Sequence, residues 1–361
     1  MRPEPSPAPQ GPSPRDTTRL SPALWCVVAA ALFGASSPAS KALLGSVGPL
    51  TLAGLLYLGA ALAVLPFVFR GGSKAARRER KNVLRMGGVV LFGGVLGPVL
   101  LLIGLSRAPA ASVSLWLNLE TPATALLAWA FFKEHLERRG LLAVVLVTGA
   151  SALLAGASGV ALVPAALLVA AACLCWGLDN NLSALVDGFT PAQSTFAKGL
   201  VAGGVNLGLG LWLEGGVESG GVVGGGLGIG ALCYGASLAL YVRGAQHLGA
   251  VRSQMLFASA PFFGVLLSWT VAGEPMLLAQ LGAAAGMAVA FVLLHGERHA
   301  HEHVHEALTH THWHRHDDGH HEDHAHEHGH VRGWHIHEHA HRARRHAHAH
   351  RPDLHHRHAH G

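Results

Sequence analysis

Charged residues are scarce in this 361-residue sequence. Asp, Glu, Lys and Arg make up 13% of it, about half of the ~25% that is usual for soluble domains. Between Pro22 and His295 charges almost vanish from a series of apolar segments and gather in the connections between them. A membrane-spanning helix needs ~20 apolar residues, so this pattern indicates an integral membrane protein rather than a soluble one.

Other absences narrow the function. There is no P-loop, which disfavours an ATP-driven pump, and no Ser/His/Asp set that would predict an enzyme. No basic stripe lies on a soluble domain, so nucleic acid is not an expected partner. The few cysteines all fall within apolar segments and are interpreted as small buried hydrophobic residues; they are Cys26, Cys173, Cys175 and Cys233.

The apolar segments predict an all-α integral membrane fold with ten transmembrane helices. The expected helices are 22–43, 50–70, 86–106, 109–132, 140–157, 163–185, 191–213, 222–245, 248–272 and 276–295. Lys and Arg collect in the connection Arg70–Arg85, in the fourth-to-fifth connection and in the N-terminal tail. Cytoplasmic loops are enriched in these residues, so we expect both termini to be cytoplasmic and the chain to lie in the cell (inner) membrane.

The two halves of the apolar region are alike at an offset of about 140 residues. Pro49 before the second predicted helix matches Pro191 before the seventh, and Pro122 in the fourth matches Pro261 in the ninth. Five helices in each half is an odd number, so the second half begins on the opposite side of the membrane and the repeat is inverted. The predicted repeats are 22–157 and 163–295.

Four stretches carry motifs that are similar to those of a known family. They read ALFGASSPASKALLGSVGPLTLAGLLYLGAALAVLP (Ala31–Pro66), ASVSLWLNLETPATALLAWAFFKEHL (Ala111–Leu136), CLCWGLDNNLSALVDGFTPAQSTFAKGL (Cys173–Leu200) and GAVRSQMLFASAPFFGVLLSWTVAGEP (Gly249–Pro275). They resemble the EamA family of the drug/metabolite transporter superfamily over about residues 22–295. The resemblance implies two inverted five-helix repeats and a secondary transporter, usually an exporter of small metabolites. The sequence departs from the family at Asp179-Asn180-Asn181 and in its C-terminal tail.

Polar side chains inside the predicted helices are candidates for a substrate site, because charges at membrane depth usually face a cavity or a partner. The candidate substrate-binding residues are Asn118, Glu120, Asp179, Asn180, Lys198 and Gln254. Glu120 and Asp179 are expected to bind substrate or a proton. The structural alternative is that Glu120 pairs with a lysine and holds the helices together.

The tail, residues 296–361, contains 25 of the 28 histidines. Its H-x-H units place imidazoles on one side of an extended chain, and neutral imidazole suits divalent Zn, Ni or Co. The predicted metal ligands are His299, His301, His303, His305, His310, His312, His314, His316, His324, His326, His328, His330, His335, His337, His339 and His341. Both this tail and the Pro-rich residues 1–21 are expected to be disordered, because they have too little apolar surface to fold.

The role of metal binding is left open by the sequence. The tail could deliver metal to the transporter, store it, respond to pH, or have no selected role. The favoured function is export of a small metabolite or drug-like solute by alternating access. The rival functions are a divalent transition-metal exporter and a non-transporting membrane metal sensor. Expected partners are the lipid bilayer, a small-molecule substrate and divalent metal ions, with a second copy of the chain as a further candidate; no cofactor is expected for transport.

The tail gives a first prediction. Because its H-x-H units overlap, the full chain is expected to bind several Zn²⁺ or Ni²⁺ ions at neutral pH, and binding should weaken as the pH falls through ~6.5, where imidazole becomes protonated. Titration calorimetry measures this. A chain lacking residues 299–361 is the control and should keep a folded membrane region. A full-length chain that takes up neither ion at neutral pH would rule out the metal assignment.

Overall fold

The computed structural model describes most of the apolar region and four segments of the tail. The described residues are 21–68, 80–132, 138–157, 159–186, 189–217, 219–248, 250–295, 299–305, 308–314, 335–341 and 344–350. The N-terminal tail predicted for residues 1–21 therefore lies, except for Ser21, outside the described residues.

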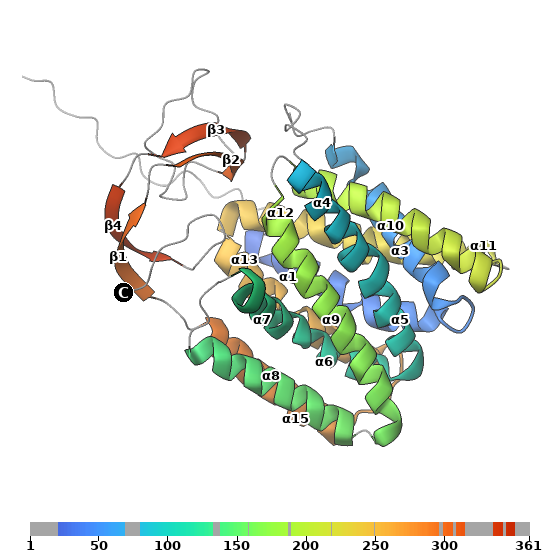
Figure 1. Cartoon of the computed structure of the whole chain (residues 1–361). Coiled ribbons are helices and arrows are strands. Elements are labelled where there is room, and N and C mark those ends of the chain that lie inside the picture. The colour runs from blue at the N-terminus through green and yellow to red at the C-terminus, as the bar shows by residue number, and fades with distance from the viewer. Residues whose placement is uncertain are drawn as a thin grey trace, which may run out of the picture.

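The first half of the apolar region is helical over nearly its whole described length, as the hydropathy pattern predicts (Figure 1). Its elements are α1 (Pro22–Gly34), α2 (Ser36–Leu43), α3 (Pro49–Val68), α4 (Arg80–Gly88), the π-helix η1 (Val89–Leu96), α5 (Gly97–Arg107), α6 (Ala110–Trp116), the 3₁₀ turn η2 (Leu117–Leu119), α7 (Glu120–Phe132) and α8 (Arg138–Ala157).

The second half has a similar order of elements. They are the 3₁₀ turn η3 (Val160–Leu162), α9 (Val163–Ala184), α10 (Pro191–Leu213), α11 (Gly220–Ile229), the π-helix η4 (Gly230–Ala236), α12 (Ser237–Leu248), α13 (Ala250–Phe257), α14 (Ala260–Thr270) and α15 (Leu278–His295).

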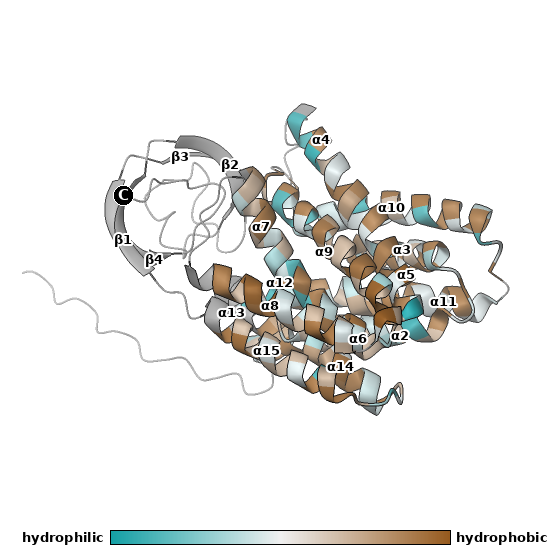
Figure 2. Cartoon of the chain, turned by 60° about the horizontal axis from the view of Figure 1, so that its bottom comes forward, coloured by the Kyte–Doolittle hydropathy of each residue, from teal (hydrophilic) through white to brown (hydrophobic). Residues whose placement is uncertain are grey.

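The helices are apolar enough to lie in a membrane. Hydrophobic residues dominate the helices, whereas hydrophilic ones gather at the free end of α4 (Figure 2). Among the described residues, six helical stretches are long and apolar enough to cross a bilayer, and three further apolar helices are shorter. The chain is thus a multi-pass membrane protein, while the full count of ten spans remains a prediction.

Both halves contain the same irregularity. The π-helices η1 and η4 interrupt the third and eighth predicted helices, about 140 residues apart, which is the spacing of the sequence repeat. Hydropathy did not reveal the π-helices, because the residues of η1 are apolar throughout. The break that divides 22–43 into α1 and α2 was also missed, although α2 (SSPASKAL) is much more polar than α1.

Helices α3 and α10 pack side by side, and glycines bring their backbones close together (Figure 1). A Cβ atom placed on Gly199 would lie 2.7 Å from the carbonyl oxygen of Tyr57, and one on Gly210 would collide with Thr51. The start of α3 therefore faces the end of α10. These helices begin at the equivalent prolines of the two halves and run antiparallel, as an inverted repeat requires.

Two carboxylates from the second half cap helix N-termini of the first half. Glu214, which follows α10, accepts hydrogen bonds from the backbone nitrogens of Leu50 and Thr51, both at 2.9 Å, and from the Thr51 hydroxyl. Glu274, in the connection after α14, accepts from the backbone nitrogens of Ala110 at 2.6 Å and Ala111 at 2.9 Å. Each carboxylate satisfies N–H groups that a helix cannot satisfy itself, so the two halves are joined at this end of the bundle.

The same end holds a third charged cap. The ammonium of Lys41 donates to the carbonyl oxygens of Leu105, at 2.6 Å, and of Ala108, at 2.9 Å, where α5 ends. A cation is favourable at a helix C-terminus, where carbonyl groups are left unpaired. We call the end of the bundle that contains Lys41, Glu214 and Glu274 the capped end.

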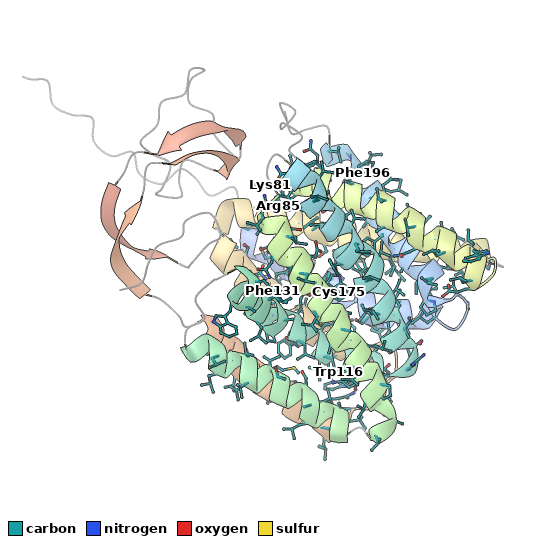
Figure 3. All side chains as sticks on the ribbon, viewed as in Figure 1. Lys81, Arg85, Trp116, Phe131, Cys175 and Phe196 are labelled. Carbon is teal, nitrogen blue, oxygen red and sulfur yellow. The ribbon has the colours of Figure 1, made fainter. Side chains whose placement is uncertain are left out.

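The opposite end is built differently. Helix α10 begins there and caps itself, since the Thr190 hydroxyl accepts from the Gln193 backbone while the Gln193 side chain accepts from the Thr190 backbone. Lys81 and Arg85 of α4 and Phe196 of α10 lie toward this end in the view of Figure 3, whereas Trp116 lies farther toward the capped end. Arg85 donates to the carbonyl oxygen of Leu185 at 2.6 Å, where α9 ends.

The described segments of the tail form two antiparallel strand pairs. Strand β1 (His299–His305) pairs with β4 (Arg344–His350), and β2 (Leu308–His314) pairs with β3 (His335–His341). We predicted a disordered tail, and the structure differs at these four segments. The reason is the alternation of the H-x-H units, whose two-residue period is that of a β-strand.

The carboxylate caps give a second prediction. Glu274→Ala removes the acceptor of two backbone N–H groups and is expected to lower the free energy of unfolding by about 1–2 kcal/mol. Glu274→Gln keeps one oxygen acceptor and should lose less. Denaturant titration of the purified protein in detergent measures both variants. Equal stability of Glu274→Ala and the unmodified chain would show that the cap contributes nothing.

Candidate functional site

A cavity of about 720 Å³ lies between helices of both halves. Its volume is in the range of small-molecule sites. All six side chains that the sequence analysis proposed for substrate binding line it, namely Asn118, Glu120, Asp179, Asn180, Lys198 and Gln254. The fold thus brings together residues that are up to 136 positions apart in the sequence, from Asn118 to Gln254.

The strongest electrostatic contact in the cavity is an ion pair. Lys198 Nζ of α10 lies 2.6 Å from Asp179 Oδ2 of α9, and the Ser183 hydroxyl donates to the other carboxylate oxygen at 3.1 Å. The Asp179 side chain is 6% exposed and the Lys198 side chain 21%. Both charges are largely removed from solvent, and each makes the other tolerable in an apolar surrounding.

The π-helix η1 makes room for this pair. A Cβ atom on Gly93 would collide with the Asp179 carboxylate, and one on Gly94 would lie 3.1 Å from Cγ of Lys198. The Gly93 carbonyl accepts hydrogen bonds from the Tyr57 hydroxyl at 2.6 Å and from Nε1 of Trp176 at 3.1 Å. Glycine is therefore required here for close approach, and a π-helix frees carbonyl groups that side chains can reach.

Glu120 is positioned by a second break in a helix. The 3₁₀ turn η2 ends at Leu119, and Glu120 begins α7, where the helix dipole favours a negative charge. Its Oε1 atom accepts from Nδ2 of Asn180 at 2.9 Å, and the same amide donates to the Thr124 hydroxyl at 3.2 Å. Among the described residues no lysine or arginine pairs with Glu120, which disfavours the structural role in which a lysine neutralises it.

The remaining two candidates lie on the cavity wall with local partners. The amide of Asn118 donates to the carbonyl oxygen of Leu115 at 3.0 Å. The Gln254 side chain accepts from the Tyr241 hydroxyl at 2.8 Å and is exposed. The Asn118 amide also donates to the sulfur of Met287 at 3.5 Å, and the amide groups of both residues can donate and accept hydrogen bonds.

The sequence analysis missed the aromatic part of the site. The chain has only three tyrosines, and all of them line the cavity: Tyr57, Tyr234 and Tyr241. Their scarcity elsewhere was the available signal, because a tyrosine inside an apolar helix needs a partner for its hydroxyl. Trp176, which lies within the sequence motif Cys173–Leu200, also lines the cavity and was not proposed as a site residue.

The cavity lies toward the end opposite the capped end. Its lining includes Thr195 in the second turn of α10, Tyr241 in the second turn of α12, which is the last element of the eighth predicted helix, and Ala290 in the last turns of α15. Lining residues near the middle of helices, such as Tyr57 and Leu101, mark its depth. The capping side chains Lys41, Glu214 and Glu274 are not among the residues that line the cavity, so it is set apart from the capped end.

The predicted metal ligands of the tail are not described in terms of side chains. His316, His324, His326, His328 and His330 lie outside the described residues, and for the others the structure gives only the strand backbone. Within the part of the chain that the structure describes, no three His, Cys, Asp or Glu residues are grouped as a metal site.

Comparison with known proteins identifies relatives of the whole apolar region. The EamA-like transporter family matches residues 20–156 and again residues 163–295. An uncharacterized transporter of Methanothermobacter thermautotrophicus is 27% identical over 277 residues, which are 70% of this chain and 80% of that protein. A solved crystal structure of a protein superposes with a TM-score of 0.56 at 17% identity, covering 76% of this chain and 96% of its own, and this shows a likeness of fold.

The ion pair gives a third prediction. Asp179→Asn and Lys198→Met each leave one charge without its partner and are expected to lower the free energy of unfolding by about 1–3 kcal/mol. The double variant replaces the pair by neutral groups of similar size, so it should cost less than the sum of the two. Denaturant titration of the three variants and the unmodified chain gives a double-mutant cycle, from which the interaction free energy of the two side chains is obtained. Strictly additive losses would mean that the two side chains do not interact.

Proposed function

Since this chain belongs to the EamA-like transporter family, whose members are membrane transporters, we propose that it is a secondary transporter that moves a small organic solute through the cavity between its two halves. One observation carries the proposal. The cavity of about 720 Å³ holds a carboxylate without a cationic partner and a buried ion pair, at a depth where isolated charges are costly unless they have a function.

Alternating access is the mechanism that this arrangement supports. The cavity lies between the halves, and the equivalent helices α3 and α10 run antiparallel, so rocking of one half against the other would expose the site to either side in turn. Ten transmembrane helices in two inverted repeats, and export from the cytoplasm, are parts of this proposal.

We propose that the chain lies in the inner membrane of the cell. In the proposed orientation both termini face the cytoplasm. The support is the run of Lys and Arg in the connection Arg70–Arg85 and the acidic residues Glu214 and Glu274 at the capped end. A reporter fused after Gly361 is the test. If the fused reporter is found outside the cytoplasm, the count of ten spans is wrong.

The tail is proposed to bind Zn, Ni or Co in the cytoplasm without forming part of the transport path. The support is the family match, which ends at residue 295 and leaves the histidine-rich segment outside both repeats. Transport of an organic solute by a chain lacking residues 299–361 should therefore persist in metal-free buffer. Metal export is the rival function. It predicts that the intact chain transports Zn²⁺, Ni²⁺ or Co²⁺ and that the same truncation abolishes this transport.

Glu120 provides the fourth prediction. Glu120→Gln keeps the shape of the side chain and its hydrogen bond from Asn180 but removes the charge, so it is expected to lower transport about tenfold or more without preventing membrane insertion. Uptake into proteoliposomes, with a panel of amino acids, amines, sugars and metal ions, measures the effect. A variant that inserts, unfolds at the normal denaturant concentration and transports at the normal rate would make Glu120 purely structural.

A further inference from the structure

The charges on the cavity wall do not balance. Among the described residues that line it, the side chains that are ordinarily charged are Glu120, Asp179 and Lys198. Lys198 is held by Asp179 at 2.6 Å, so this pair is internally neutral. Glu120 receives a hydrogen bond from the neutral amide of Asn180, and its other oxygen, Oε2, accepts none from any described residue. The lining therefore carries one uncompensated negative charge when the carboxylates are ionised.

Aromatic rings form a continuous wall in the same cavity. The ring centroids of Tyr57 and Tyr234 are 6.3 Å apart, those of Tyr234 and Phe33 5.6 Å, those of Phe33 and Phe257 5.5 Å, and those of Phe257 and Tyr241 4.9 Å. We call these five residues the aromatic wall. The faces of such rings attract cations, and the rings also bury the apolar body of a ligand.

We propose that the cavity binds an organic amine in its cationic form, with the ammonium group on Glu120 and the apolar body along the aromatic wall. The inference rests on the transporter function proposed above and names its class of substrate. An ammonium would donate to the free oxygen of Glu120 and cancel the excess charge of the lining.

Other classes of ligand fit the same site less well. An anion would meet the uncompensated Glu120 carboxylate, while the available cation, Lys198, is already engaged by Asp179. A zwitterion would need Lys198 to leave Asp179, which would expose a buried carboxylate. A bare divalent cation prefers several oxygen or nitrogen ligands, and no group of three acidic, histidine or cysteine residues is found among the described residues.

The test compares four probes that share one apolar body and differ in charge. They are 2-phenylethylamine, 2-phenylethanol, 3-phenylpropanoate and phenylalanine, titrated calorimetrically into the purified full chain in detergent at neutral pH. The amine is expected to bind about tenfold or more tightly than the neutral alcohol, and the carboxylate to bind most weakly. Absence of amine binding, or equal or tighter binding of the alcohol, the carboxylate or phenylalanine, would overturn the proposal.

The affinity of cavity variants for the amine tests which side chains contribute to its binding. Glu120→Gln should weaken amine binding about 10- to 100-fold and bring it to the level of the alcohol. Tyr234→Leu should weaken it about 3- to 10-fold, and Tyr234→Phe should restore most of the loss because the π face is retained. Glu214→Gln is the matched control, since this carboxylate lies at the capped end outside the cavity lining and the change should leave the affinity within about twofold. Unchanged amine affinity in Glu120→Gln would also overturn the proposal, and the probe series on the unmodified chain decides the matter if that variant does not fold.

Binding and transport are measured separately, so the two proposals can fail separately. A chain that moves other solutes into proteoliposomes but does not bind 2-phenylethylamine keeps the transporter function and loses the amine assignment. A chain that binds the amine through Glu120 but moves no solute keeps the site and loses the transporter function.

Discussion

The ion pair between Lys198 and Asp179 is the contact on which the arrangement of the cavity depends. Neither charge is stable alone in an apolar surrounding, so α9 and α10 must stay where the two side chains meet at 2.6 Å. Gly93 of η1 yields the space for the carboxylate, and its carbonyl is held by Tyr57 and Trp176. Asn180, the next residue along α9, is thereby directed to Glu120. One buried electrostatic contact thus orders the polar residues on three predicted helices.

Much of the fold could be predicted because a bilayer makes strong demands on composition. The predicted limits 191–213 agree with α10, and 50–70 agrees within two residues with α3. The predicted family is confirmed by the match over both halves. The π-helices η1 and η4 escaped prediction, because they leave the apolar pattern intact. The breaks at Ala35 and η2 lie beside polar residues, which do not by themselves specify where a helix is interrupted. Trans caps such as Glu274 on Ala110 are equally non-local, since 163 residues separate Ala111 from Glu274.

The site was predictable only in its charged and amide residues. Glu120, Asp179 and Lys198 stand out in a sequence because their cost at membrane depth demands an explanation. Phenylalanine carries no such cost, so Phe33 was indistinguishable from an ordinary packing residue, and a tyrosine such as Tyr234 gives only the weaker signal of a hydroxyl that needs a partner. The partners of the charges could not be predicted either. The sequence left open that Glu120 pairs with some lysine, whereas in the structure Lys198 pairs with Asp179 and Glu120 has an amide partner. Spacing along a chain does not specify which of two carboxylates a lysine on another helix reaches.

The carboxylate caps have a consequence for leakage. Five hydrogen bonds from Leu50, Thr51, Ala110 and Ala111 end on Glu214 and Glu274, and every one of them joins the first half to the second. The described residues at the other end are joined differently. The N-terminal N–H groups of α10 are satisfied within that helix by Thr190, and the halves are linked there by Arg85, which donates to the carbonyl oxygen of Leu185 at 2.6 Å, and not by a carboxylate cap. In the proposed rocking motion, separation of the halves at the capped end would break five hydrogen bonds to carboxylates, so we expect that end to open less readily than the other. If the protein transports as proposed, a capped end that stays closed would limit the leakage of ions through the cavity from one side of the membrane to the other.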